Sequence, residues 1–123
     1  QLQDVYSMPY FSPETGAFCA HEFVTVPRSL LDKGVTLVDI AKRMIDYGVH
    51  PPTMHWPVQD CLMVEPTETE SKQALDSFIA VMLQIATEIE HDIDTVKNAP
   101  LVSDIARVDE VSAARTPFLA WTD

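Results

Sequence analysis

Glycine and cysteine are both scarce in this sequence of 123 residues. Only three glycines occur, and no two of them lie close together. Loops that cradle phosphate groups need clustered glycines, so the chain has no nucleotide-binding loop of this kind. The two cysteines, Cys19 and Cys61, form neither a CxxC pair nor a metal-binding spacing. We expect free, buried thiols in a reducing compartment, which favours a cytoplasmic protein.

Positive charge and long apolar runs are also lacking. Eight Lys and Arg residues stand against nineteen Asp and Glu residues, for a net charge of -11. This balance disfavours a nucleic-acid-binding protein or a basic membrane-surface protein. The longest apolar run, Phe78 to Leu83, is too short to span a bilayer, and no signal-peptide pattern occurs. We therefore expect neither nucleic acid nor a membrane among the partners.

One stretch, Tyr47 to Pro57 (YGVHPPTMHWP), concentrates the unusual residues. It holds two of the four His, one of the two Trp and three of the nine Pro. Proline fixes φ and removes an amide donor, so this loop has a largely predetermined shape. A rigid loop with His and Trp is a typical place for a functional site, although a connector with packed aromatics explains the pattern equally well. His50 and His55 are five apart without a nearby Cys or carboxylate, so we expect no metal site.

Hydrophobic periodicity predicts a series of strands and helices around this loop. Residues 17–26, which include His21 and Glu22, are predicted to form a strand, followed by a loop over 28–35. A helix is predicted over 37–47, with Thr36 and Asp39 as its capping box and Gly48 as the C′ residue.

The second half of the chain predicts an extended piece over 49–54 and a buried strand over 60–65. Thr67 and Glu70 have the spacing of a second capping box for a long helix. Its apolar stripe comprises Leu75, Phe78, Ile79, Met82, Leu83, Ala86, Ile89 and Ile93. The pattern breaks from Thr95, residues 98–100 form a stop, and residues 108–114 predict one short helical turn. The terminal Trp121 is expected to dock on a core or a partner.

This order predicts a two-layer α+β sandwich, in which a small, mainly antiparallel sheet is covered by helices. We expect an irregular lead-in over 1–16, a small α+β domain over 17–94, and a tail over 95–123 that packs on the domain or a partner. The first residue is Gln1 rather than Met, which suggests a piece of a longer protein. No serine has a GxSxG context, and the residues alone define no complete active site. A stand-alone regulatory or ligand-binding α+β module is the alternative interpretation.

Two motifs carry a resemblance to a known family: Gly48 to Met54 (GVHPPTM) and Leu62 to Glu68 (LMVEPTE). They resemble the C-terminal region of the glycine cleavage system P-protein, the pyridoxal-phosphate-dependent glycine dehydrogenase (decarboxylating). Further matching segments are His21 to Val24, Asp39 to Arg43, Asn98 to Pro100, Asp109 to Val111, Ala113 to Arg115, and Trp121. The tail is most similar to subunit 2 of the two-subunit form. The departures are Val49 in place of Phe, Leu101 in place of His, and a 102–106 segment that lacks the family's basic residues.

The resemblance implies a small C-terminal domain of a fold-type-I enzyme. The family's Schiff-base lysine follows a His, whereas none of Lys33, Lys42, Lys72 and Lys97 does. Pyridoxal phosphate is therefore expected on the remainder of the P-protein, and this piece alone is expected to bind no cofactor, to contain no catalytic residue and to be inactive. The implied reaction releases CO2 from glycine and passes the aminomethyl group to the lipoyl arm of the H-protein. The other implied partner is the second subunit of the P-protein.

Within that framework, His50, Thr53 and His55 are our candidates for residues that border the active-site mouth of the intact enzyme. Small domains of this class close over the cofactor, which favours this role. The other interpretation is that Pro51 and Pro52 merely shape a domain interface and that His50 forms a structural hydrogen bond.

Overall fold

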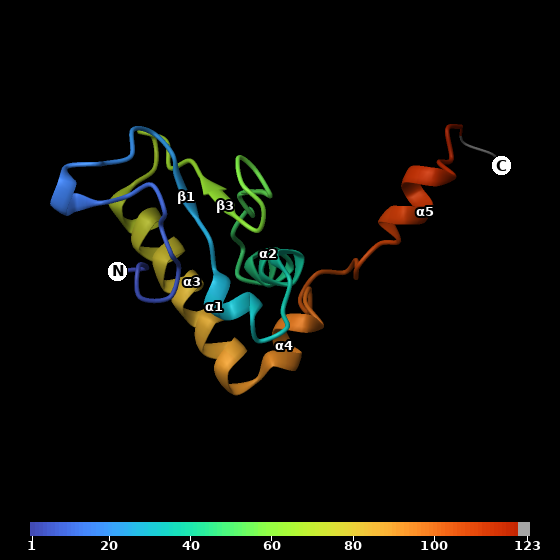
Figure 1. Ribbon diagram of the computed structural model, residues 1–123. Helices are drawn as coiled ribbons and strands as arrows, with labels where there is room; N and C mark the ends of the chain where they lie inside the picture. Colours follow the sequence, from blue (N-terminus) through green and yellow to red (C-terminus); the bar gives the residue numbers. More distant parts are fainter. Residues whose placement is uncertain (121–123) are drawn as a thin grey trace.

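The computed structural model describes residues 1–120 and has a three-stranded sheet with helices packed beside it (Figure 1). The strands are β1 (Phe23–Thr25), β2 (Thr53–Met54) and β3 (Leu62–Val64), in the order β1-β3-β2. Both neighbouring pairs are antiparallel. The helices are η1 (Pro13–Thr15), α1 (Arg28–Leu31), α2 (Leu37–Asp46), α3 (Lys72–His91), α4 (Ile93–Lys97) and α5 (Glu110–Arg115). This arrangement confirms a small two-layer α+β fold.

Helix α2 begins and ends where its sequence signals predict. Thr36 Oγ1 accepts a hydrogen bond from the Asp39 N–H (3.1 Å), and the Thr36 N–H donates to the Asp39 carboxylate (2.7 Å). At the other end, Gly48 adopts φ 73°, a conformation that favours glycine. The Val49 N–H then donates to the Met44 carbonyl (3.0 Å), as in a Schellman motif. The capping box and the C′ glycine are therefore confirmed.

Helix α3 begins later than its predicted capping box. The side chain of Ser71 accepts from the Ala74 N–H (3.1 Å) and caps the helix, which starts at Lys72. Thr67 and Glu70 form a turn instead, in which the Glu70 N–H donates to the Thr67 carbonyl (3.0 Å). The second capping box was therefore the wrong prediction, although the helix itself is confirmed.

The first strand is shorter than predicted, because its partner β3 has only three residues to pair with. Strand β1 covers Phe23–Thr25 rather than 17–26, so His21 and Glu22 precede it. The segment 28–35, predicted as a loop, starts with the one-turn helix α1.

The long helix also ends before the predicted position. Asp92 adopts φ -152° and ψ 68°, which separates α3 from α4 and puts Ile93 in the second helix. Helix α4 runs past Thr95, where the sequence pattern breaks, to the predicted stop at Asn98. The short helix predicted over 108–114 is confirmed as α5.

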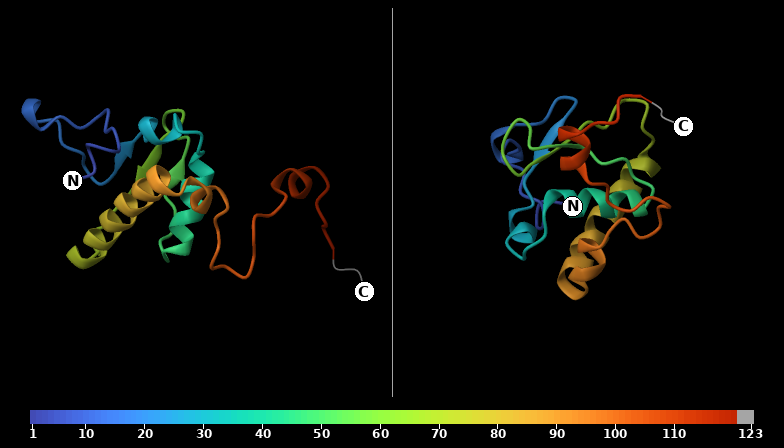
Figure 2. Two further views of the ribbon diagram at one scale, coloured as in Figure 1. Left: turned by 90° about the horizontal axis from the view of Figure 1, so that it is seen from below. Right: turned by 90° about the vertical axis from the view of Figure 1, so that its right-hand side faces the viewer.

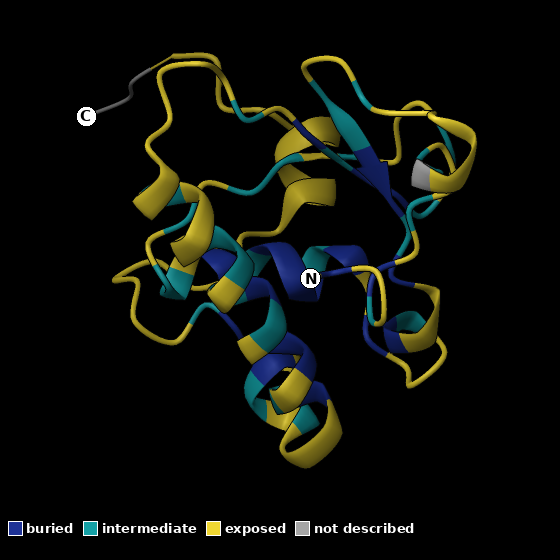
Figure 3. Ribbon diagram, turned by 90° about the vertical axis from the view of Figure 1, so that its left-hand side faces the viewer, coloured by how far each residue is buried: buried dark blue, intermediate teal, exposed yellow. Residues whose placement is uncertain are grey.

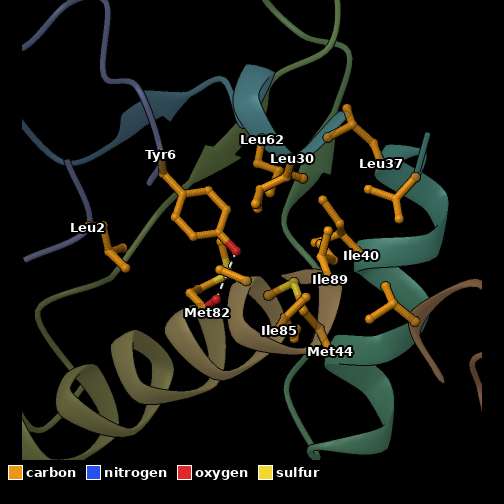
Figure 4. Packing of buried hydrophobic residues seen from close by; sticks show 13 residues of the cluster. Leu2, Tyr6, Leu30, Leu37, Ile40, Met44, Leu62, Met82, Ile85 and Ile89 are labelled. Carbon is orange, nitrogen blue, oxygen red and sulfur yellow. Dashed lines mark hydrogen bonds between the residues drawn. The ribbon is translucent and has the colours of Figure 1, made fainter. Parts of the chain in front are cut away.

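The core lies where α2, α3 and α4 meet β3 and the N-terminal segment. Leu2 and Tyr6 of this segment are buried in it, and the Tyr6 hydroxyl donates to the Met82 carbonyl (2.8 Å; Figure 4). Burial raises the pKa of the Tyr6 hydroxyl well above its usual value. Val96 of α4 is fully buried in the same cluster. The core thus includes residues before position 16 and after position 94, which are the predicted domain boundaries. The division of the chain at these two points stays a prediction.

After α4 the chain forms an exposed arm, residues 101–120, that extends away from the core (Figures 1 and 2). Its root is fixed to α2, since the N–H groups of Leu101 and Val102 donate to the Asp46 carboxylate (2.7 and 2.9 Å). Farther out, Phe118 and Leu119 are 91% and 90% exposed. The predicted docking of Trp121 lies outside the described residues. Within residues 1–120, no helix combines the length and apolarity needed to cross a membrane.

Candidate functional site

An open groove of about 960 Å³ lies beside the Pro-rich loop. Its walls come from the loop after α2, strand β3, the first half of α3 and the N-terminal segment. His50 and Thr53 are exposed and line this groove. Two of the three candidate residues therefore face one concave surface.

The loop that presents His50 is held at both ends. Gly48 stops α2 with its positive φ, and Thr53 starts β2, where it pairs with Met63 of β3. Between these points, Pro51 and Pro52 restrict φ and contribute to the groove wall. The side chain of His50 is thus placed by a helix end, a proline pair and a strand rather than by a free loop.

His55 lies outside the residues that line the groove. It follows β2 in the hairpin loop, adopts φ 60°, and its N–H donates to the Cys61 carbonyl (2.9 Å). Its Nδ1 lies 3.3 Å from Gln59 Nε2 and 3.8 Å from Asp60 Oδ1. The structure therefore does not bring His55 together with His50 and Thr53.

The groove is mainly apolar, with His50, Thr53, Glu65 and Glu70 as its main polar contributors. Among the described residues that line it there is no Lys and no Arg. Pyridoxal phosphate needs an amine for its aldehyde and donors for its phosphate. The residues on this surface supply carboxylates instead, so they do not fit the cofactor by themselves.

Three side chains near the sheet edge bring possible metal ligands within 4.8 Å of one another: His21, Glu22 and Glu65. The β1–β3 register, continued one step past the Phe23–Val64 pair, opposes Glu22 to Glu65. His21 and Glu22 have side chains that are 79% and 41% exposed. Opposed carboxylates repel one another, so this edge of the sheet attracts a positive charge.

An ion-pair network supports the helix from which the loop emerges. The Arg43 guanidinium binds Glu88 through Nε (2.8 Å) and Nη2 (2.9 Å), and Asp46 through Nη1 (3.0 Å). Tyr47, whose ring lies under this guanidinium, also donates to Glu88. Hydrogen bonds from Arg43 lower the pKa of Glu88, and they outweigh the opposing effect of burial.

The pKa of Asp46 is also below its usual value, for a different balance of causes. Burial of the carboxyl raises its pKa. Hydrogen bonds from the N–H groups of Val102 and Leu101 and from Arg43 lower the pKa, and together they outweigh the effect of burial. The side chain of Asp46 is only 1% exposed. Arg43 and Asp46 thereby join α2 to α3 and to Leu101 and Val102 at the start of the arm.

Two groups of groove residues could not be assigned from the sequence. Leu2 and Met8 belong to the segment predicted as an irregular lead-in, and Phe78 belongs to a stripe predicted as core. The signal for Leu2 is its apolar side chain between Gln1 and Gln3, whereas no comparable signal marks Met8. The two cysteines are free, with Cys61 buried as predicted and Cys19 half-buried.

Comparison with known proteins identifies the family. The family model described as "Glycine dehydrogenase, C-terminal domain" matches residues 1–105. A protein named probable glycine dehydrogenase (decarboxylating) subunit 2 in Exiguobacterium sibiricum is 47% identical over 123 residues, which cover 98% of this chain and 24% of the relative. A protein of the same name in Halalkalibacterium halodurans is 50% identical over 115 residues, covering 92% of this chain and 24% of the relative.

The chain thus spans about a quarter of the length of the curated relatives it matches. The family match includes both walls of the groove, from the N-terminal segment to α3. The GVHPPTM and LMVEPTE motifs lie within the matched residues as well. The chain therefore belongs to the family of glycine dehydrogenase C-terminal domains.

Proposed function

We propose that this chain is the C-terminal part of a decarboxylating glycine dehydrogenase, and that its groove forms one wall of the active-site mouth in the complete protein. This activity is the one that the names of its relatives describe. The placement is supported by one observation above all: His50 and Thr53 line the same open groove on a rigidly held loop. Such concave, mainly apolar surfaces with a few convergent polar groups are typical of ligand sites.

Pyridoxal phosphate is the cofactor that we propose for the complete protein, bound outside this chain. The described groove residues do not fit it, because none of them is a Lys that could bind its aldehyde or an Arg that could bind its phosphate. Two of the four lysines are also engaged in ion pairs, Lys33 with Glu90 and Lys72 with Asp76. The residues of this chain are therefore assigned to shaping and enclosing the site rather than to cofactor chemistry.

His50 and Thr53 supply hydrogen bonds in this proposal. An imidazole ring offers a donor and an acceptor, and a hydroxyl offers both. Next to apolar walls that exclude water, such groups orient a bound molecule more effectively than they would in solvent. His55 has a different proposed role, because its backbone bond to Cys61 closes the hairpin between β2 and β3.

The proposed partners of the complete protein are a second P-protein subunit and the lipoylated H-protein. The name "subunit 2" of the relatives supports the first of these. The arm over residues 101–120 is a proposed docking element of the tail, since its root is fixed by Asp46 while its outer side chains have no apolar cover. The two free cysteines support a cytoplasmic location.

The test is His50→Ala in the complete protein with its partner subunit. Because His50 is exposed and outside the core, we expect the rate of glycine decarboxylation to fall by about tenfold or more, with thermal stability almost unchanged. His91→Ala is the matched control, as His91 is exposed in the last turn of α3 and outside the groove. Equal activities for the two variants, or a parallel loss of folding in His50→Ala, would contradict the proposal.

A further inference from the structure

The first half of α3 has an apolar face that the described part of the chain covers only in part. Leu75 is 38% exposed and Phe78 is half-buried, whereas Met82 and Ile85, farther along the same face, are fully buried. Figure 2 shows this end of the helix extending beyond the sheet. The groove lies along this partly covered half of the stripe, between α3 and the loop that bears His50.

The N-terminus of the chain lies at the same groove. Gln1 and Leu2 are among its lining residues. Figure 3 shows the N-terminus on the side of the molecule that faces the viewer in that view. A polypeptide that continues before Gln1 therefore leaves directly from the groove wall. About three quarters of the length of the relatives lies outside the matched region, and the family model describes a C-terminal domain. The segment before Gln1 is thus the polypeptide with the shortest path into the groove.

One end of the groove is acidic. Glu65 and Glu70 line it, and Glu22 opposes Glu65 one step past the β1–β3 ladder. Of these three carboxylates, only Glu22 has an ion-pair partner within residues 1–120, and this partner is His21 at 3.7 Å. An occupant with apolar side chains along the groove and a cation at this end would complement both features.

We propose that the α3 side of the groove seats the polypeptide that precedes Gln1 in the complete protein, and that a Lys or Arg of this segment binds between Glu22 and Glu65. The inference rests on the proposed function only in that a longer chain exists. It adds that the C-terminal domain is joined to the body of its own subunit along α3, which leaves His50 and Thr53 on the loop side of the groove facing the active-site mouth. The uncovered part of the α3 stripe is then core of the complete protein.

The test uses a photoreactive amino acid, p-benzoylphenylalanine, in the complete protein with its partner subunit. It replaces Ser77, an exposed groove residue of α3, or Thr87, an exposed residue in the second half of the same helix and outside the groove. After irradiation, we expect crosslinked peptides between residue 77 and upstream residues of the same chain, at several times the yield from residue 87. The denatured product should migrate as a single chain. Crosslinks to the partner subunit or to a second copy, or equal yields from both positions, would overturn the proposal.

The charge contact is tested in the same experiment. Glu65→Lys is expected to lower the crosslink yield from residue 77 severalfold, and Glu65→Gln is expected to lower it less. Glu68→Lys is the control, because Glu68 is exposed and does not line the groove. Equal yields in Glu65→Lys and Glu68→Lys would overturn the cation contact. These readouts do not depend on catalysis, so their failure is distinguishable from failure of the proposed function, which the His50→Ala rate measures.

Discussion

Replacing Ile85 by alanine is expected to lower the free energy of unfolding of the chain by about 3 kcal/mol, within the range for a large aliphatic residue cut to Ala in a packed core. Ile85 is 0% exposed and lies in the middle of α3, within the cluster that joins this helix to α2 and β3 (Figure 4). The substitution removes three methyl or methylene groups and leaves a cavity, because neighbouring side chains relax only in part. Urea unfolding followed by circular dichroism measures the effect.

Leu75→Ala is the matched control for Ile85→Ala. Leu75 lies on the same helix but is 38% exposed and does not belong to the core cluster. In the isolated chain, Leu75→Ala should lower the free energy of unfolding by less than about 1 kcal/mol, because the substitution removes little buried apolar area. In the complete protein the cost should rise, because the proposed occupant of the groove covers Leu75. Equal losses for Ile85→Ala and Leu75→Ala in the isolated chain would contradict the assigned core.

Arg43→Ala is expected to lower the free energy of unfolding by about 2–3 kcal/mol at pH 7, because it strands two carboxylates that are largely removed from water. The guanidinium makes three hydrogen bonds to Glu88 and Asp46, and all three side chains are at most 13% exposed. The substitution also frees the ring of Tyr47 from its contact with the guanidinium.

The effect of Arg43→Ala depends on pH in a defined direction. Glu88 and Asp46 have folded pKa values below their ordinary ones, so the folded state binds fewer protons than the unfolded state. Their contribution to stability is complete above the unfolded pKa values of about 4 and is lost as the pH falls through the lower folded values. The difference between Arg43→Ala and the unchanged chain should therefore be largest near neutral pH and shrink below about pH 4.

Lys42→Ala is the control for the Arg43 variant. Lys42 is the neighbouring residue on α2, is half-buried, and forms no ion pair with a described residue. Its removal should change the free energy of unfolding by less than about 0.5 kcal/mol, as is usual for surface substitutions. A pH-independent loss in Arg43→Ala, or a loss as large in Lys42→Ala, would contradict the role of the network.

Local sequence signals predicted the structure best where side-chain and backbone groups of one short segment form hydrogen bonds with each other. The capping box of Thr36 and Asp39 and the C′ role of Gly48 are of this kind, and both are confirmed. Neither depends on distant contacts, because each satisfies hydrogen-bonding groups within the same turn of chain. The fold class followed from the order of such elements.

The start of α3 shows where local signals were insufficient. The sequence offers hydroxyl caps at both Thr67 and Ser71, four residues apart. The apolar stripe begins only at Leu75, after both residues, so it is compatible with either start. In the structure Thr67 and Glu70 form a turn, and Ser71 caps the helix.

The groove could be predicted only in part. The Pro-rich loop was identified from its composition, and His50 and Thr53 do line the groove. Leu2 and Met8, which are more than 38 residues before the Pro-rich loop in the sequence, also line the groove. No periodicity within residues 1–16 predicts this position. His55 has the same composition signal as His50, but a positive φ directs it into the hairpin loop.

The most direct test of the account is an absorbance titration of the purified 123-residue chain with pyridoxal phosphate, with and without glycine. We expect no saturable band of a lysine adduct, in a chain that still unfolds cooperatively with urea, because none of the described residues that line the groove is a Lys or an Arg. A saturable, stoichiometric band that disappears when one of the four lysines is replaced by arginine would contradict it. The cofactor site would then lie at least partly within this chain.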